Sequence, residues 1–142
     1  MPSLRPYHLF ISHAWKYGAD YDRLVSLLDN APNFQYYNYS APKDKPLHNL
    51  DETSVGTVLE IKAAIDRKIK LCSCILVISG MYYNNRRWMR YELESASKFG
   101  KPIIAIRPYG NTVTPSDVQQ CADVIVGWNT NSIVSAIREH SL

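Results

Sequence analysis

The sequence predicts an α/β fold built on a parallel sheet, and two observations carry that prediction. Short apolar runs bounded by turn residues alternate along the chain with longer segments of helical period. Four of these runs, residues 8–11, 74–78, 102–106 and 123–126, lack the alternation of polar and apolar positions that a half-exposed strand shows. Strands of this kind are covered on both faces, as they are in a parallel sheet.

The remaining elements follow from the same patterns. The more polar run at 34–39 is assigned to an edge strand, and residues 21–30 and 58–69 carry apolar side chains at helical spacing. A third helix opens near residue 85, and a last helix at about 130–140 has Asn129 or Asn131 as its N-cap. Right-handed crossovers on five strands lead most simply to a flavodoxin-like, doubly wound sheet of order 2-1-3-4-5.

Length and composition exclude several classes of protein. A chain of 142 residues has the size of one domain, so residues 1–142 are assigned to a single domain. The formal net charge is only +3, and positive and negative residues are interspersed along the chain. This pattern argues against a surface that binds nucleic acid. The apolar run Ile75–Ile78 is far too short to cross a bilayer, and the N-terminus resembles no targeting segment, so the expected location is the cytoplasm.

The cysteines and histidines do not predict a metal site. Cys72 and Cys74 lie two residues apart, Cys121 stands alone, and the four histidines have no metal-ligand spacing. We expect three reduced thiols and no bound metal.

In a doubly wound sheet the ligand crevice lies beyond the carboxyl ends of the strands, where the strand order reverses. Residues 12–15, 40 onward, 79–83 and 107–109 are expected there. None of these segments has the acidic residues of a response regulator, and no G-x-G-x-x-G or Walker motif is present for a dinucleotide or triphosphate. Any nucleotide must therefore bind in another way.

The third helix carries a candidate active-site carboxylate. At about 100° per residue, Met89, Leu93 and Ala96 form its core stripe and Glu92 lies at the border of that stripe. A half-buried carboxylate near the start of a helix that begins at the crevice is a candidate functional group. The alternative is that Glu92 only caps the helix or pairs with a nearby arginine, Arg86 or Arg90.

The second glutamate of this helix has a simpler interpretation. Glu94 points away from the core stripe and has Lys98 four residues later. We expect a solvated ion pair between them, worth a few tenths of a kcal/mol.

Several segments together resemble a known family. Residues 87–93, followed by 100–104, are similar to the W-x-x-x-E helix and the next strand of TIR domains that cleave NAD+. Residues 10–15 and 38–42 resemble the first strand and the loop after the second strand in the Thoeris antiphage TIR-like proteins. The likeness extends in order along nearly the whole chain.

The resemblance implies an NAD+ glycohydrolase or ADP-ribosyl cyclase that makes an ADP-ribose-derived signalling nucleotide in antiphage defence. NAD+ would be the substrate, with no cofactor, and Glu92 would be the catalytic carboxylate. Self-association of TIR domains and a separate effector protein activated by the product are the implied partners. Two other functions stay open, namely a non-catalytic interaction module and a nucleoside N-ribosyl transferase with Glu92 as covalent nucleophile.

The remaining site residues are candidates for substrate binding. Ser12 and His13 would donate to ribose or phosphate oxygens, aromatic side chains would stack on the rings, and Trp88 would also fix the helix that presents Glu92. The complete predicted set is Ser12, His13, Trp15, Tyr39, Ser40, Tyr82 and Trp88. Ten tyrosines against three phenylalanines are typical of wet binding surfaces, and Tyr91 is among those expected at the rim of the crevice.

Overall fold

A computed structural model describes residues 6–12, 19–39, 55–78, 86–107 and 116–141. Within them, five strands form one sheet with the order β2-β1-β3-β4-β5, and every neighbouring pair is parallel. The predicted flavodoxin-like α/β fold and its strand order are confirmed. The elements in chain order are β1 (Tyr7–Ser12), α1 (Ala19–Asp29), β2 (Tyr36–Asn38), α2 (Val55–Leu71), β3 (Cys74–Ile78), α3 (Arg86–Lys98), β4 (Ile103–Ile106), α4 (Ser116–Cys121), β5 (Val124–Val126) and α5 (Thr130–His140).

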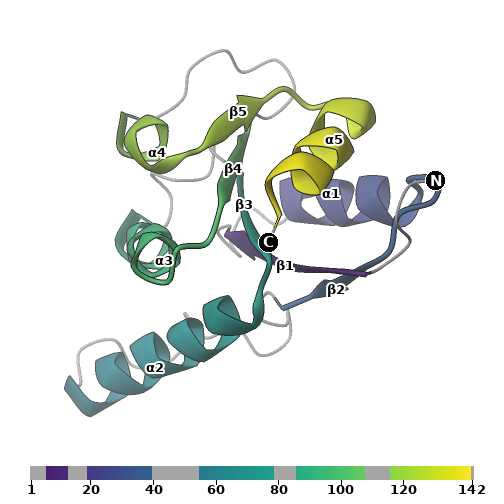
Figure 1. Ribbon diagram of the computed structural model, residues 1–142. Helices are drawn as coiled ribbons and strands as arrows, with labels where there is room; N and C mark the ends of the chain where they lie inside the picture. The colour runs from purple at the N-terminus through teal and green to yellow at the C-terminus, as the bar shows by residue number, and fades with distance from the viewer. Residues whose placement is uncertain (1–5, 13–18, 40–54, 79–85, 108–115, 142) are drawn as a thin grey trace.

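The helices form a layer on each face of the sheet (Figure 1). Helices α1 and α5 pack together on one face, and α2, α3 and α4 lie in succession on the other. Strands β3 and β4 in the middle are buried along their whole length. The core therefore lies on both sides of these strands, which is why their sequences are apolar throughout.

The last strand departs from the prediction. Residues 123–126 were expected to be covered on both faces, yet β5 is an edge strand in which Ile125 is 36% exposed and its neighbours are half-buried. Three residues at the end of the sheet are not enclosed by helices as β3 is. The polar run at 34–39 is confirmed as an edge strand, although its paired part is limited to Tyr36–Asn38.

Local sequence explains the last helix. The Asn129 side chain accepts a hydrogen bond from the backbone N–H of Ser132 at 3.1 Å, which confirms Asn129 as one of the two predicted N-caps. Ile133, Val134, Ala136 and Ile137 form the buried face of α5. No helix in the described part of the chain is long and apolar enough to cross a membrane.

Candidate functional site

Helix α3 places Glu92 in the interior of the molecule. Met89, Leu93 and Ala96 are fully buried, as the periodicity predicts, and Glu92 beside them is only 2% exposed. The helix starts after the carboxyl end of β3 and runs back along the sheet, so Glu92 lies about 9 Å along the axis from its first residue at 1.5 Å per residue. The burial of this carboxyl group is not explained by apolar packing alone, because removing it from water costs free energy unless hydrogen-bond donors reach its oxygens.

On the exposed face of the same helix, the charged side chains of Arg90 and Glu94 pair with each other. Arg90 Nε donates to Glu94 Oε1 at 3.2 Å, and both side chains are 59% exposed. The expected partner of Glu94 was Lys98, whose ammonium instead lies 5.1 Å from the centre of the Phe99 ring. Glu92 and Glu94 are therefore in unlike environments, and Arg90 is engaged with Glu94 on the outer face.

Ser12 lies at the carboxyl end of β1, in register with Val77 of β3. Strand order reverses between these two strands, with β2 on the far side of β1 and β4 on the far side of β3. The Ser12 side chain is completely buried, and none of the described residues forms a hydrogen bond with its Oγ. A buried hydroxyl that lacks a hydrogen-bond partner in the described part of the chain, at the point where strand order reverses, is suited to bind a polar group of a ligand.

Tyr39 follows β2, and its side chain turns toward the other end of the sheet. Its hydroxyl is 2.8 Å from Nδ1 of His8, and the two rings stack with centroids 5.4 Å apart. His8 precedes Ser12 by four residues, or about 13 Å along a strand. The structure thus does not bring the Tyr39 side chain to Ser12.

The remaining predicted binding residues lie wholly or in part outside the described structure. His13, Trp15, Ser40 and Tyr82 lie outside the described residues. The backbone of Trp88 belongs to the first turn of α3, one turn before Glu92, but its side chain is also outside the described part.

Sequence reasoning missed a polar contact between α2 and α3. The hydroxyl of Tyr91, expected at the crevice rim, donates to both carboxylate oxygens of Asp66 at 3.0 Å each, and Ser95 Oγ donates to Asp66 Oδ1 at 2.6 Å. Burial, followed by the hydrogen bond to Asp66, raises the pKa of Tyr91 to about 12. No signal in the sequence pairs Asp66 with residues 25 and 29 positions away.

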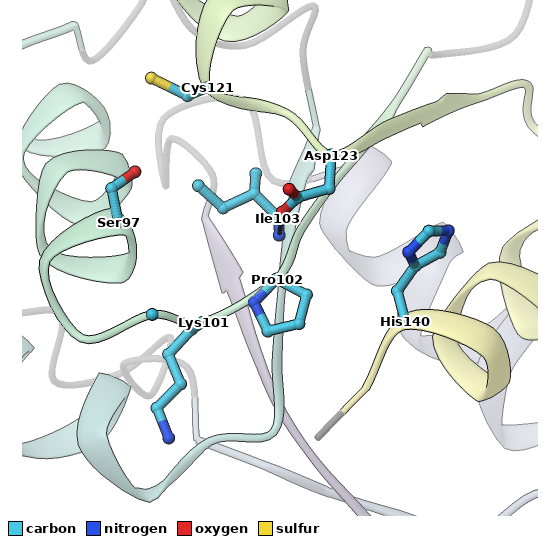
Figure 2. A pocket seen from close by; sticks show the side chains of 8 residues that line it. Ser97, Lys101, Pro102, Ile103, Cys121, Asp123 and His140 are labelled. Atoms are coloured by element: carbon cyan, nitrogen blue, oxygen red, sulfur yellow. Dashed lines mark hydrogen bonds between the residues drawn. The ribbon is translucent and has the colours of Figure 1, made fainter.

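A cavity of about 540 Å³ lies at the amino ends of β4 and β5, at the end of the sheet opposite to Ser12 (Figure 2). Ser97, Gly100, Lys101, Pro102, Ile103, Cys121, Asp123 and His140 line it. Asp123 Oδ2 accepts the backbone N–H of Ile103 at 2.8 Å, and Lys101 points away from Asp123. Helices α3, α4 and α5 all end here, so the Lys101 ammonium lies where it can offset the partial negative charge of the helix ends. The carboxylate of Asp123 therefore has a structural role in this cavity.

The thiols and the acidic groups do not assemble a metal centre in the described ranges, where no group of three or more His, Cys, Asp or Glu could hold an ion. Cys72 and Cys74 are buried, and burial raises the pKa of each thiol to about 12. Protonated thiols are poor metal ligands and poor nucleophiles.

Comparison with known proteins gives one family. The sequence profile described as "Thoeris protein ThsB, TIR-like domain" matches residues 10–113, a range that includes every predicted site residue. No curated protein matches the chain. Among solved structures, that of the Clostridium botulinum CMP N-glycosidase BcmB is similar, with 11% sequence identity, a TM-score of 0.47, and coverage of 92% of this chain and 97% of that chain.

Proposed function

The chain belongs to the family of the Thoeris ThsB TIR-like domain, and we propose that it cleaves the bond between nicotinamide and ribose in NAD+ and makes an ADP-ribose-derived signalling nucleotide in antiphage defence. The observation that carries the proposal is the near-complete burial of Glu92 at the border of the core face of α3, within the segment that the family profile matches. A carboxylate that is sheltered from water, on a helix that starts beyond the carboxyl end of β3, suits chemistry on a cationic substrate.

One carboxylate is enough for this reaction. The bond between ribose C1′ and the pyridinium nitrogen breaks, and its electron pair goes to the nitrogen, so nicotinamide leaves as a neutral molecule and needs no general acid. The positive charge passes to the C1′ side of the ribose, where Glu92 would stabilise it and hold the ribose hydroxyls. An O-glycosidase, by contrast, must also protonate its leaving group, which requires a second carboxyl.

The fate of the ribosyl cation depends on what lies next to it. Addition of water, with loss of one proton, gives ADP-ribose. A hydroxyl or nitrogen of the same nucleotide, held in contact with C1′ in a site that excludes water, gives a cyclic product. The proposal thus covers both a glycohydrolase and a cyclase, and product analysis distinguishes them.

Ser12 is the second described residue of the proposed site. Its buried hydroxyl, at the point where strand order reverses, would donate to a ribose or phosphate oxygen of NAD+. His13, Trp15, Ser40, Tyr82 and Trp88 complete the proposed binding set, with stacking assigned to the aromatic rings. For Tyr39 the proposal is limited to its ring, because its hydroxyl is engaged by His8.

The decisive assay is nicotinamide release from NAD+ by the wild type and by Glu92→Gln, with products identified by mass spectrometry. Glu94→Gln is the matched control, because it removes a carboxylate from the exposed face of the same helix. We expect Glu92→Gln to lower the rate by at least about 100-fold and Glu94→Gln to leave it within about twofold. Equal release by the wild type and Glu92→Gln would refute the mechanism.

Two further outcomes separate the other functions. Trapping a covalent ribosyl adduct on Glu92 would support an N-ribosyl transferase. Absence of release at high protein concentration and with infected-cell extract would identify a non-catalytic interaction module. A dilution series tests the proposed self-association, since the rate per molecule should fall on dilution, and addition of the product to candidate effector proteins tests the proposed downstream partner.

A further inference from the structure

The carboxylate of Asp66 connects α2 to the part of α3 that carries Glu92. Two hydroxyls donate to it: the Tyr91 hydroxyl shares its hydrogen between the two carboxylate oxygens, at 3.0 Å from each, and Ser95 Oγ donates to Oδ1 at 2.6 Å. Tyr91 directly precedes Glu92, and Ser95 follows it by three residues. The two anchor points therefore flank Glu92 along the helix.

The geometry of an α-helix determines what these anchors control. Tyr91 and Ser95 are four residues apart and so lie on one face, which α2 covers. At about 100° per residue, Glu92 is about 60° from Ser95 and about 40° from the core residue Ala96. Glu92 lies between the face held by Asp66 and the face packed on the sheet, so a small rotation of α3 about its axis would move its carboxyl out of the site.

The hydrogen bonds that Tyr91 and Ser95 donate to Asp66 oppose such a rotation of α3. Hydrogen bonds to an ionised carboxylate are shorter and stronger than those between neutral groups, and the Ser95 contact has the length expected of one. Ser95 is buried, and the Lys62 ammonium lies 5.2 Å from the centre of the Tyr91 ring. Two side chains one turn apart on α3 are thus held by one rigid acceptor on α2.

We infer that Asp66 is a positioning residue for Glu92, fixing the rotation of α3 so that the Glu92 carboxylate faces the ribose of the bound substrate. This inference rests on the proposed function for its catalytic consequence. Asp66 itself would not touch the substrate, and its substitution should lower kcat for nicotinamide release while leaving KM for NAD+ nearly unchanged.

The kinetic test compares Asp66→Asn with Glu60→Gln. Both substitutions remove one negative charge from α2, but the side chain of Glu60 is exposed. We expect kcat to fall about tenfold in Asp66→Asn with KM within about twofold, and no change in Glu60→Gln. In a Glu92→Gln background, Asp66→Asn should have no further effect on the residual rate, because it acts through Glu92. An equal fall in both backgrounds would overturn the inference.

A second test does not depend on activity. With ¹³C-labelled glutamate carboxyl groups, the Glu92 resonance is identified by its absence in Glu92→Gln. Ser95→Ala keeps the charge of Asp66 and removes only the 2.6 Å hydrogen bond, so it reports orientation instead of charge. We expect Ser95→Ala and Asp66→Asn to shift or broaden the Glu92 resonance, and Glu60→Gln to leave it in place.

The two tests separate failure of this inference from failure of the proposed function. An unmoved Glu92 resonance in both Ser95→Ala and Asp66→Asn would overturn the role of Asp66, whatever the wild type does to NAD+. A resonance that moves in a protein without nicotinamide release would uphold the positioning contact and contradict the proposed reaction.

Discussion

The substitution Glu92→Met exchanges a buried carboxylate for an apolar side chain of similar length. Because the side chain at this position is 2% exposed, the methionine would be almost wholly removed from water, which is worth roughly 1.5–3 kcal/mol. The two methylene groups of the glutamate already contribute about 1.6 kcal/mol, at about 0.8 kcal/mol each, so the net apolar gain is between about 0 and about 1.4 kcal/mol. The exchange also removes the cost of burying the carboxyl group, together with the interactions that this group makes.

An apolar side chain removes the cost of burying a polar one, whereas a partner group left buried without its hydrogen bond costs about 1–3 kcal/mol, so the two effects oppose each other. We therefore expect the free energy of unfolding of Glu92→Met to stay within about 1 kcal/mol of the wild-type value, while nicotinamide release is lost. Urea denaturation followed by far-UV circular dichroism measures this difference, and an unchanged m-value shows that the two unfolding transitions are comparable.

Met89→Ala, one turn earlier on α3, is the control for a residue that serves only packing. Met89 is fully buried, so its truncation should cost about 2–5 kcal/mol. A Glu92→Met protein less stable than the wild type by more than about 1 kcal/mol would show that the carboxylate holds the fold together, and would refute the reasoning that it is retained for chemistry.

Three other measurements test the structure more widely. Arg90→Ala and Glu94→Ala should each change the free energy of unfolding by at most about 0.5 kcal/mol, because this pair is exposed; a larger change that persists in high salt would contradict that. Burial raises the pKa of Cys72 and Cys74 from 9.0 to about 12, so the unfolded chain loses these protons first. Stability should therefore fall as the pH rises above about 9, and less steeply in Cys72→Ala, in urea titrations at several pH values. Asn129→Ala should lower stability by about 1 kcal/mol in thermal unfolding, and an unchanged midpoint would show that the cap of α5 is dispensable.

Several features of the fold could be predicted because they depend on local sequence. The apolar runs of β3 and β4, the stripe of Met89, Leu93 and Ala96, and the cap of α5 are each encoded within a few consecutive turns or residues. Right-handed crossovers then leave few possible strand orders, which is why the order could be predicted without contacts.

Other features required the folded chain. Strand β5 has an apolar sequence like that of β3 and lies at the predicted end of the sheet, but only the packing of the helices decides that Ile125 is partly exposed. Arg90 and Lys98 are both four residues from Glu94 and are equally good partners by spacing. The side-chain arrangement selects Arg90 and directs Lys98 over the Phe99 ring.

The candidate site also combines features that the sequence predicts with features that only the folded chain shows. The sequence alone determined that a carboxylate at position 92 borders a core stripe on a helix that starts at the carboxyl edge of the sheet, because helical periodicity is a local property. Only the tertiary structure decided that this carboxyl is buried, that Tyr39 turns toward His8, and that Asp66 binds Tyr91 and Ser95. Those contacts join residues from 25 to 31 positions apart, and their distances depend on how whole elements pack, which no local pattern of residues records.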